Sequence, residues 1–197
     1  MEAKNADSTE GLSNTRREKL HSRTIEMHGY RRSDGLYEVE GRVTDRKAYD
    51  FSPPGPGRGV IKANATIHDM TVRIVFDQSL TVKSIDTQTA FAPYAACKSG
   101  GTNFDSLIGL RMIQGWSREV KSRLKGASSC THLMELLGPM ATTAYQTLAD
   151  VRINTAPELD KDGRPVKIDS CWAYVAHGDV VQHLWPNFYR PSGNRTP

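Results

Sequence analysis

A thiol and an imidazole, two groups that bind metals or move protons, stand two residues apart in Cys130-Thr131-His132. The small residues of 126–129 precede them, as is typical where one helix ends and the next is capped. Apolar residues then recur at helical spacing as far as Val151. The pattern predicts a helix N-terminus, where the helix dipole would lower the pKa of a thiol. It leaves open whether Cys130 is a ligand, a nucleophile or a packed residue.

One face of this expected helix is polar and carries no Lys or Arg, which favours either a solvated face or the wall of a pocket. We expect His132 and Glu135 to perform acid–base chemistry there. A mid-helix proline bends the axis and frees a carbonyl. The remaining residues of the face are candidate substrate-binding groups around that bend: Thr142, Thr143 and Gln146. At about 100° per residue, Cys130 falls at the edge of the apolar stripe, so we expect it and His132 to point in different directions.

The preceding helical pattern is basic, and Arg118 in its first turn is our candidate for binding an anionic oxygen of a substrate. Trp116 beside it is a candidate for substrate contact. Further upstream, Tyr30 and Arg31 form a candidate base and acid-binding pair, with a solvent-exposed strand edge as the alternative.

His68 and Asp69 stand near the start of an alternating apolar segment. Since neighbouring residues of a strand point to opposite faces, only one of them needs to face a site. Asp69 is our candidate catalytic carboxylate, and His68 is a candidate ligand or base.

The 197 residues carry a formal charge of +4, and 38% of them are hydrophobic. This composition predicts a single globular domain over 23–190, with disordered or loosely docked tails at 1–22 and 191–197. Three cysteines argue against a disulfide framework. No apolar run is long enough to span a membrane and no signal core follows Met1, so we expect a cytoplasmic protein without a membrane partner.

Turn signals and a change of period predict an α+β fold with an antiparallel sheet built from hairpins and two or three helices packed on one face. The expected sheet strands are 25–32 and 36–44 around Asp34-Gly35, then 65–76 and 80–90. Helical patterns follow as far as about 151. A closing hairpin is expected from 168–176 and 180–185 around His177-Gly178-Asp179.

Several motifs together resemble a bacterial family known as domain of unknown function 2889, over most of the chain from about residue 20. These motifs include His28-Gly29-Tyr30-Arg31-Arg32, His68-Asp69-Met70, Gly115-Trp116-Ser117-Arg118, Cys130-Thr131-His132-Leu133 and Trp185-Pro186. The resemblance implies an association with the breakdown of aromatic compounds, including lignin-derived ones. It further implies a cofactor-free lyase that releases formaldehyde from a phenolic dimer.

The order of elements also resembles the iron–sulfur scaffold proteins of the NifU type, which implies a NifU/SufE-like architecture. In that comparison His68 begins the strand, Cys97 lies in the following loop and Cys130 begins the helix. The sequence departs from the scaffold pattern because the first cysteine has no cysteine counterpart and Thr131 separates the thiol from the imidazole.

The sequence is compatible with three functions. The first is a cofactor-free enzyme acting on a small aromatic molecule, with His132, Glu135, Arg118, Asp69 and Tyr30 as catalytic candidates. The second is a zinc or iron protein with Cys97, Cys130, His132 and His68 as ligands. The third is a non-catalytic binding module. Nucleic acid is not an expected partner because the basic stretches lack interleaved aromatic residues, and the sequence allows a homo-oligomer.

Overall fold

A computed structural model describes residues 16–153 and 155–191. Contacts divide the chain into two compact units, residues 1–148 and 149–197. The expected tails at 1–22 and 191–197 lie largely outside the described residues, and His21 already belongs to the first strand. The single domain expected over 23–190 stays a prediction.

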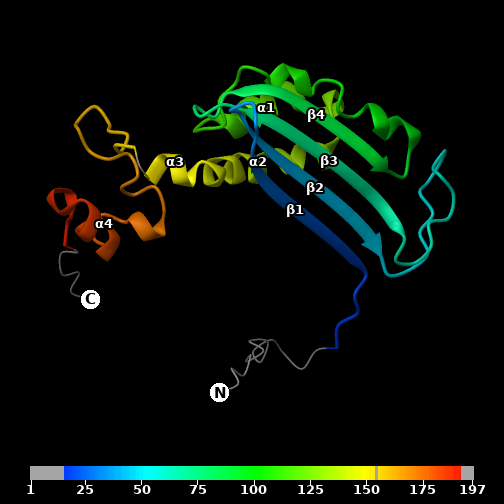
Figure 1. Cartoon of the computed structure of the whole chain (residues 1–197). Coiled ribbons are helices and arrows are strands. Elements are labelled where there is room, and N and C mark those ends of the chain that lie inside the picture. The colour runs from blue at the N-terminus through cyan, green and yellow to red at the C-terminus, as the bar shows by residue number, and fades with distance from the viewer. Residues whose placement is uncertain (1–15, 154, 192–197) are drawn as a thin grey trace. The chain divides into compact units, whose positions relative to one another are not determined.

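The first unit contains a four-stranded antiparallel sheet in the order β1-β2-β3-β4 (Figure 1). Its strands are β1 (His21–Arg31), β2 (Tyr37–Lys47), β3 (Thr66–Phe76) and β4 (Val82–Phe91). The Asp34-Gly35 turn joins β1 to β2, with Gly35 at a φ of 83°, as expected for this hairpin signal. The α+β class and the hairpin-built sheet are confirmed.

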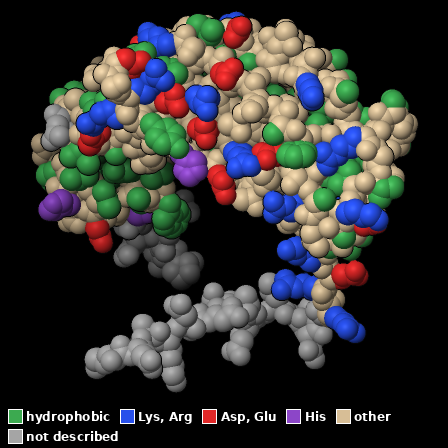
Figure 2. Space-filling model, turned by 45° about the vertical axis from the view of Figure 1, so that its right-hand side comes forward, with side chains coloured by type: hydrophobic (Ala, Val, Ile, Leu, Met, Phe, Trp, Pro, Cys, Tyr) green, Lys and Arg blue, Asp and Glu red, His purple; other side chains and the backbone are tan. Residues whose placement is uncertain are grey.

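Burial alternates along β2 and β3 because one face of the sheet is covered and the other is open. On β3 the covered face carries Met70, Val72, Ile74 and Phe76, all fully buried. On the open face, ion pairs join neighbouring strands, for example Arg73 with Glu40 at 2.9 Å. Basic and acidic side chains are likewise intermixed on the part of the surface seen in Figure 2.

Helix α2 (Thr131–Thr147) packs across β1, β2 and β3, and α1 (Trp116–Leu124) packs against α2. The buried residues of α2 are those of the apolar stripe: Leu133, Leu136, Leu137, Met140 and Ala144. Two strand glycines permit this close approach. A Cβ on Gly29 would lie 1.8 Å from Oγ1 of Thr147, and one on Gly41 would lie 3.0 Å from Met140.

Three short 3₁₀ helices lie between β4 and α2, two of them before α1 and one between α1 and α2. They are η1 (Ala95–Ser99), η2 (Phe104–Leu107) and η3 (Gly126–Ser128). The backbone amide of Cys130 donates to the carbonyl of Gly100 at 2.8 Å, which ties the start of α2 to the loop after η1.

The second unit contains α3 (Ala149–Ile153), η4 (Trp172–Tyr174), α4 (Asp179–Leu184) and η5 (Pro186–Phe188). The closing hairpin expected here is wrong. Residues 179–184 form the helix α4, in which Val181 is buried while Val180 and Leu184 are exposed. The acidic Asp179 in its first turn favours this helix. The preceding segment is held instead by the Asp169 carboxylate, which accepts a hydrogen bond from the amide of Ala176.

Among the helices of the described residues, none combines the length and the apolarity that crossing a membrane requires.

Candidate functional site

A buried carboxylate lies at the centre of the site. Asp45 stands on β2 in the inward row of Tyr37, Val39, Gly41 and Val43, and only 1% of it is exposed. Among the described residues it is the only buried polar or charged residue. A bulge interrupts the β2–β3 register directly after it. A charged group in a core position requires partners, since an unpaired buried charge is strongly unfavourable.

Arg23 supplies the first partner from β1, where it lies directly opposite Asp45. Its guanidinium donates two hydrogen bonds of 2.8 Å, from Nε to Oδ1 and from Nη2 to Oδ2. His21 Nε2 lies 3.2 Å from Oδ1. Burial alone would raise the pKa of Asp45, but Arg23 and then His68 outweigh it and lower this pKa to about 2. The carboxylate is therefore ionised at neutral pH.

His68 supplies the second partner from β3, with Nδ1 2.9 Å from Oδ2 of Asp45. An ionised carboxylate only accepts hydrogen bonds, so Nδ1 carries the proton and Nε2 of the neutral ring keeps its lone pair. Burial lowers the pKa of His68, and the neighbouring His132 lowers it further, while Asp45 offsets part of the change. The geometry favours a neutral, oriented imidazole.

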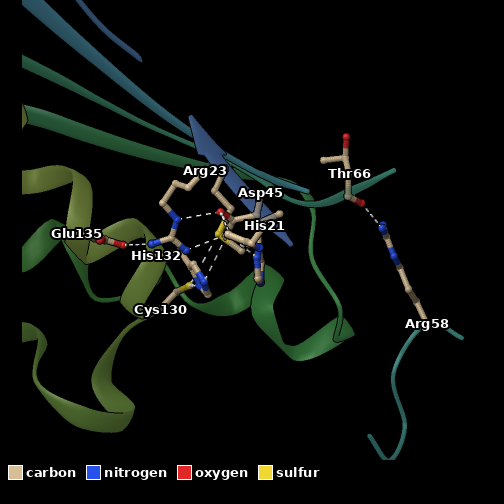
Figure 3. A network of polar contacts seen from close by, with 10 residues as sticks. His21, Arg23, Asp45, Arg58, Thr66, Cys130, His132 and Glu135 are labelled. Carbon is tan, nitrogen blue, oxygen red and sulfur yellow. Dashed lines mark hydrogen bonds and ion pairs between the residues drawn. The ribbon is translucent and has the colours of Figure 1, made fainter. Parts of the chain in front are cut away.

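The start of α2 adds a second imidazole and a thiol. The rings of His68 and His132 have centroids 3.9 Å apart, tilted by 31°. His132 Nε2 lies 3.9 Å from Oδ2 of Asp45, and its Nδ1 lies 3.8 Å from Sγ of Cys130. Figure 3 shows Arg23 and Asp45 of the sheet close to Cys130 and His132 at the start of α2, while Arg58 and Thr66 form a separate contact.

Cys130 and His132 face each other, so the expected divergence of their side chains is wrong. Cys130 is the N-cap of α2, with φ −75° and ψ 126°, and the helical rotation of 100° per residue does not apply to it. Burial would raise the pKa of Cys130, but His132 and the backbone amides of Leu133 and His132 outweigh it and lower the pKa.

An open cavity of about 740 Å³ adjoins the cluster. His68, Cys130 and His132 line one part of it, and the segments around η1 and η3 line the rest. The other lining residues are Pro93, Tyr94, Ala96, Cys97, Ser99, Gly100, Thr102, Asn103, Ala127, Ser128, Ser129 and Thr131. The lining therefore includes two histidines but no Lys, Arg, Asp or Glu.

The comparisons with known proteins give a family. Residues 21–146 match the family described as protein of unknown function (DUF2889). The chain belongs to the DUF2889 family. No curated protein and no solved structure matches it. The matched range contains every residue of the Asp45 cluster, which we define as His21, Arg23, Asp45, His68, Cys130 and His132.

Within this DUF2889 chain, the structure brings together part of the site expected from the sequence. His132, His68 and Cys130 meet at the cavity, and Cys97 lines the same cavity. Glu135, one turn beyond His132, is exposed and forms an ion pair with Arg23, so it lies at the edge of the Asp45 cluster.

Asp69 and Tyr30 lie on the open face of the sheet, opposite α2. Asp69 accepts hydrogen bonds of 2.8 and 2.6 Å from Arg42, and Tyr30 lies opposite Glu38 in the strand register. The alternation of the strand explains the placement, because His68 faces the cluster and its neighbour therefore faces away.

Three further candidates lie away from the cluster. Arg118 is exposed on α1 and is not among the cavity residues. Trp116 is buried, and its Nε1 donates to the carbonyl of Leu137 at 2.9 Å, which joins α1 to α2. Arg31 ends β1, eight residues and about 27 Å along the strand from Arg23.

The remaining candidates lie farther along α2, at least ten residues and about 15 Å beyond His132. The hydroxyls of Thr142 and Thr143 donate to the carbonyl of Pro139 at 2.8 and 3.0 Å. Gln146 is exposed one turn later. None of the three is among the residues that line the cavity.

Sequence reasoning missed Asp45, Arg23 and His21. One signal could have revealed Asp45, because it continues the inward alternation of Val39, Gly41 and Val43. A carboxylate at such a position must be paired or functional.

Proposed function

We propose that this DUF2889 protein is an enzyme that performs acid–base catalysis on a small neutral molecule in the cavity beside His68 and His132, without a cofactor. The observation that carries the proposal is the 2.9 Å contact between buried Asp45 and His68, a residue that also lines the cavity.

Asp45 would act on the substrate through His68. Its carboxylate accepts a hydrogen bond from Nδ1–H of His68 and thereby fixes the tautomer, so that Nε2 is the basic nitrogen. Arg23 holds the carboxylate from the other side with two hydrogen bonds, which limits its rotation. His68 would then act as the general base, and His132 would donate a proton or stabilise developing negative charge.

The cavity lining supports a neutral substrate. It contains no Lys or Arg to bind a carboxylate or a phosphate. Tyr94, Pro93 and Ala96 provide apolar surface, while Thr102 and Asn103 provide hydroxyl and amide groups. A hydroxylated aromatic molecule combines these two properties.

The narrower proposal is a cytoplasmic lyase of aromatic catabolism that releases formaldehyde from a phenolic, lignin-derived dimer. It rests on the sequence resemblance together with the histidine pair. Such a reaction needs a base beside a substrate hydroxyl and a group that stabilises the developing charge. His68 and His132 would fill these roles: His132 keeps the acid–base role expected from the sequence, and His68 takes the role of base in place of Asp69.

The test is formaldehyde release from a panel of phenolic dimers that carry a hydroxymethyl side chain, run beside analogues that keep this side chain and carry an added carboxylate elsewhere on the dimer. We expect turnover of neutral dimers and at least tenfold lower kcat/KM for the carboxylates. Absence of turnover across the panel would contradict the lyase, and a preference for carboxylates would contradict the neutral cavity.

A metal-binding protein is the second candidate. One ligand atom from each of Asp45, His68 and His132 lies within 4.8 Å of the others, an arrangement that zinc or iron could use. Both Asp45 oxygens, however, already accept hydrogen bonds from Arg23. A cation would compete with that guanidinium, so we rank this candidate second.

Elemental analysis of protein purified without added metal or chelator separates the two candidates. Stoichiometric zinc or iron would support the metal protein and contradict the cofactor-free enzyme. Mass measured in solution tests whether the chain forms a homo-oligomer, which we retain as a proposal.

A further inference from the structure

The three cysteines have different surroundings, and one of them differs in a way that bears on reactivity. Cys130 is half-buried, lines the cavity and lies 3.8 Å from Nδ1 of His132. Cys97 is also half-buried and lines the same cavity from η1. Cys171 is exposed in the second unit. The acid–base proposal uses none of the three thiols.

We propose that Cys130 and His132 form a nucleophilic thiol–imidazole pair, which gives the cavity a covalent site for small electrophiles, in particular aldehydes. The pair shares the cavity of the proposed acid–base site, but its reactivity does not depend on turnover there.

Three features of the fold favour transfer of the thiol proton to His132. Nδ1 of the His132 imidazole lies 3.8 Å from the sulfur. On its other side, Nε2 lies 3.9 Å from the ionised Asp45, which would stabilise an imidazolium. The sulfur stands at the N-cap of a 17-residue helix, where the unpaired amides and the helix dipole favour a negative charge.

The loop after η1 fixes where the sulfur stands. A Cβ on Gly100 would lie 2.5 Å from Cβ of Cys130, and the Gly100 carbonyl accepts the Cys130 amide at 2.8 Å. Met70 Sδ lies 3.8 Å from Sγ on the side of the sheet. Because backbone and core close these sides, an electrophile would reach the sulfur from the cavity.

The addition to an aldehyde is balanced without any further reactant. Sγ of the thiolate attacks the carbonyl carbon, a C–S bond forms, and the carbonyl π electrons move to oxygen. The proton that His132 took from the thiol passes to this oxygen, which gives a neutral thiohemiacetal and a neutral imidazole. The reverse sequence releases the aldehyde.

The experiment is alkylation of the folded full chain with limiting iodoacetamide at pH 7, with the site read by peptide mass. We expect Cys130 to react faster than both Cys97 and Cys171, although Cys171 is the exposed one. In His132→Gln the rate at Cys130 should fall at least tenfold, while the rate at Cys171 stays the same. His28→Gln, a change on the open face of the sheet, is the matched control.

A second measurement identifies the ligand class. Propionaldehyde should slow alkylation of Cys130 but not of Cys171, and dilution of the aldehyde should restore the rate. The proposal is overturned if Cys130 reacts no faster than Cys171 in the wild-type chain, a comparison that needs no variant to fold. It is also overturned if propionaldehyde gives no protection. Neither readout measures turnover. If the protein proves not to be a lyase, the proposal of a thiol–imidazole pair is unaffected, and if the pair proves unreactive, the lyase proposal is unaffected.

Discussion

Arg23 and Asp45 lie directly opposite each other on β1 and β2 and are joined by two hydrogen bonds of 2.8 Å on the covered face of the sheet. The carboxylate is buried, while 30% of the arginine side chain is exposed. Arg23 therefore holds a charge in the core that would otherwise be unstable there, and it orients that charge toward His68.

The first prediction concerns this pair. Arg23→Met should lower the free energy of unfolding by about 3 kcal/mol, because it leaves Asp45 as a buried charge without its main partner. Arg42→Met is the matched control, since Arg42 forms the same two-bond contact with Asp69 on the open face. Arg42→Met should lower the free energy of unfolding by less than about 1 kcal/mol. Urea unfolding measures both, and equal losses would contradict the special role of Arg23.

The second prediction concerns pH. The pKa of His68 is lowered in the folded chain, so the unfolded chain binds this proton first as the pH falls through about 6.5. Asp45 has a folded pKa of about 2, so its contribution is complete above the unfolded value of 3.8 and is lost below it. Stability should therefore fall in two stages on acidification.

Urea midpoints at pH 8, 5 and 3 measure the two stages. In His68→Gln the loss between pH 8 and pH 5 should be smaller than in the wild-type chain, while the loss between pH 5 and pH 3 should persist. If the loss of stability between pH 8 and pH 5 is the same in this variant as in the wild-type chain, His68 is not its cause.

The third prediction concerns the docking of α2 on the sheet. Gly29→Ala should destabilise the fold because its Cβ would lie 1.8 Å from Oγ1 of Thr147. Adding Thr147→Ala should recover part of the loss. Gly138→Ala in α2 is the control, because a Cβ there meets no atom within 4 Å outside its chain neighbours and the backbone of its own helix. Since Pro139 crowds a Cβ at this position, the gain in helix propensity is offset, and the free energy of unfolding should change by less than about 1 kcal/mol. Thermal unfolding of the three variants and the wild-type chain measures these changes, and an unchanged stability in Gly29→Ala would contradict the contact.

Much of the fold could be predicted because it depends on local patterns. Alternation on β3 and the Asp34-Gly35 turn predict the sheet, and the apolar stripe from Leu133 to Ala144 predicts α2. The prediction of a closing hairpin was wrong because Val180 and Val181 are β-branched, and the segment is short enough to fit either a strand or a helix period.

The site was predictable only in part because its centre depends on register across strands. The expected strands ended at Thr44 and began at Ile25, so Asp45 and Arg23 both fell just outside them. Their pairing appears only when β1 and β2 are extended and aligned. His132 was found because it stands beside a recognisable helix start, whereas Arg118 was chosen for its charge and lies outside the cavity lining.

The central claim is that His68 is the base of the cavity, and the most direct test compares two histidines changed in the same way. Formaldehyde release from the phenolic dimers is measured for the wild-type chain, for His68→Gln and for His28→Gln, whose site lies on the open face. We predict that His28→Gln keeps the wild-type kcat/KM and that His68→Gln loses about 100-fold or more. Equal rates in the two variants would contradict the account.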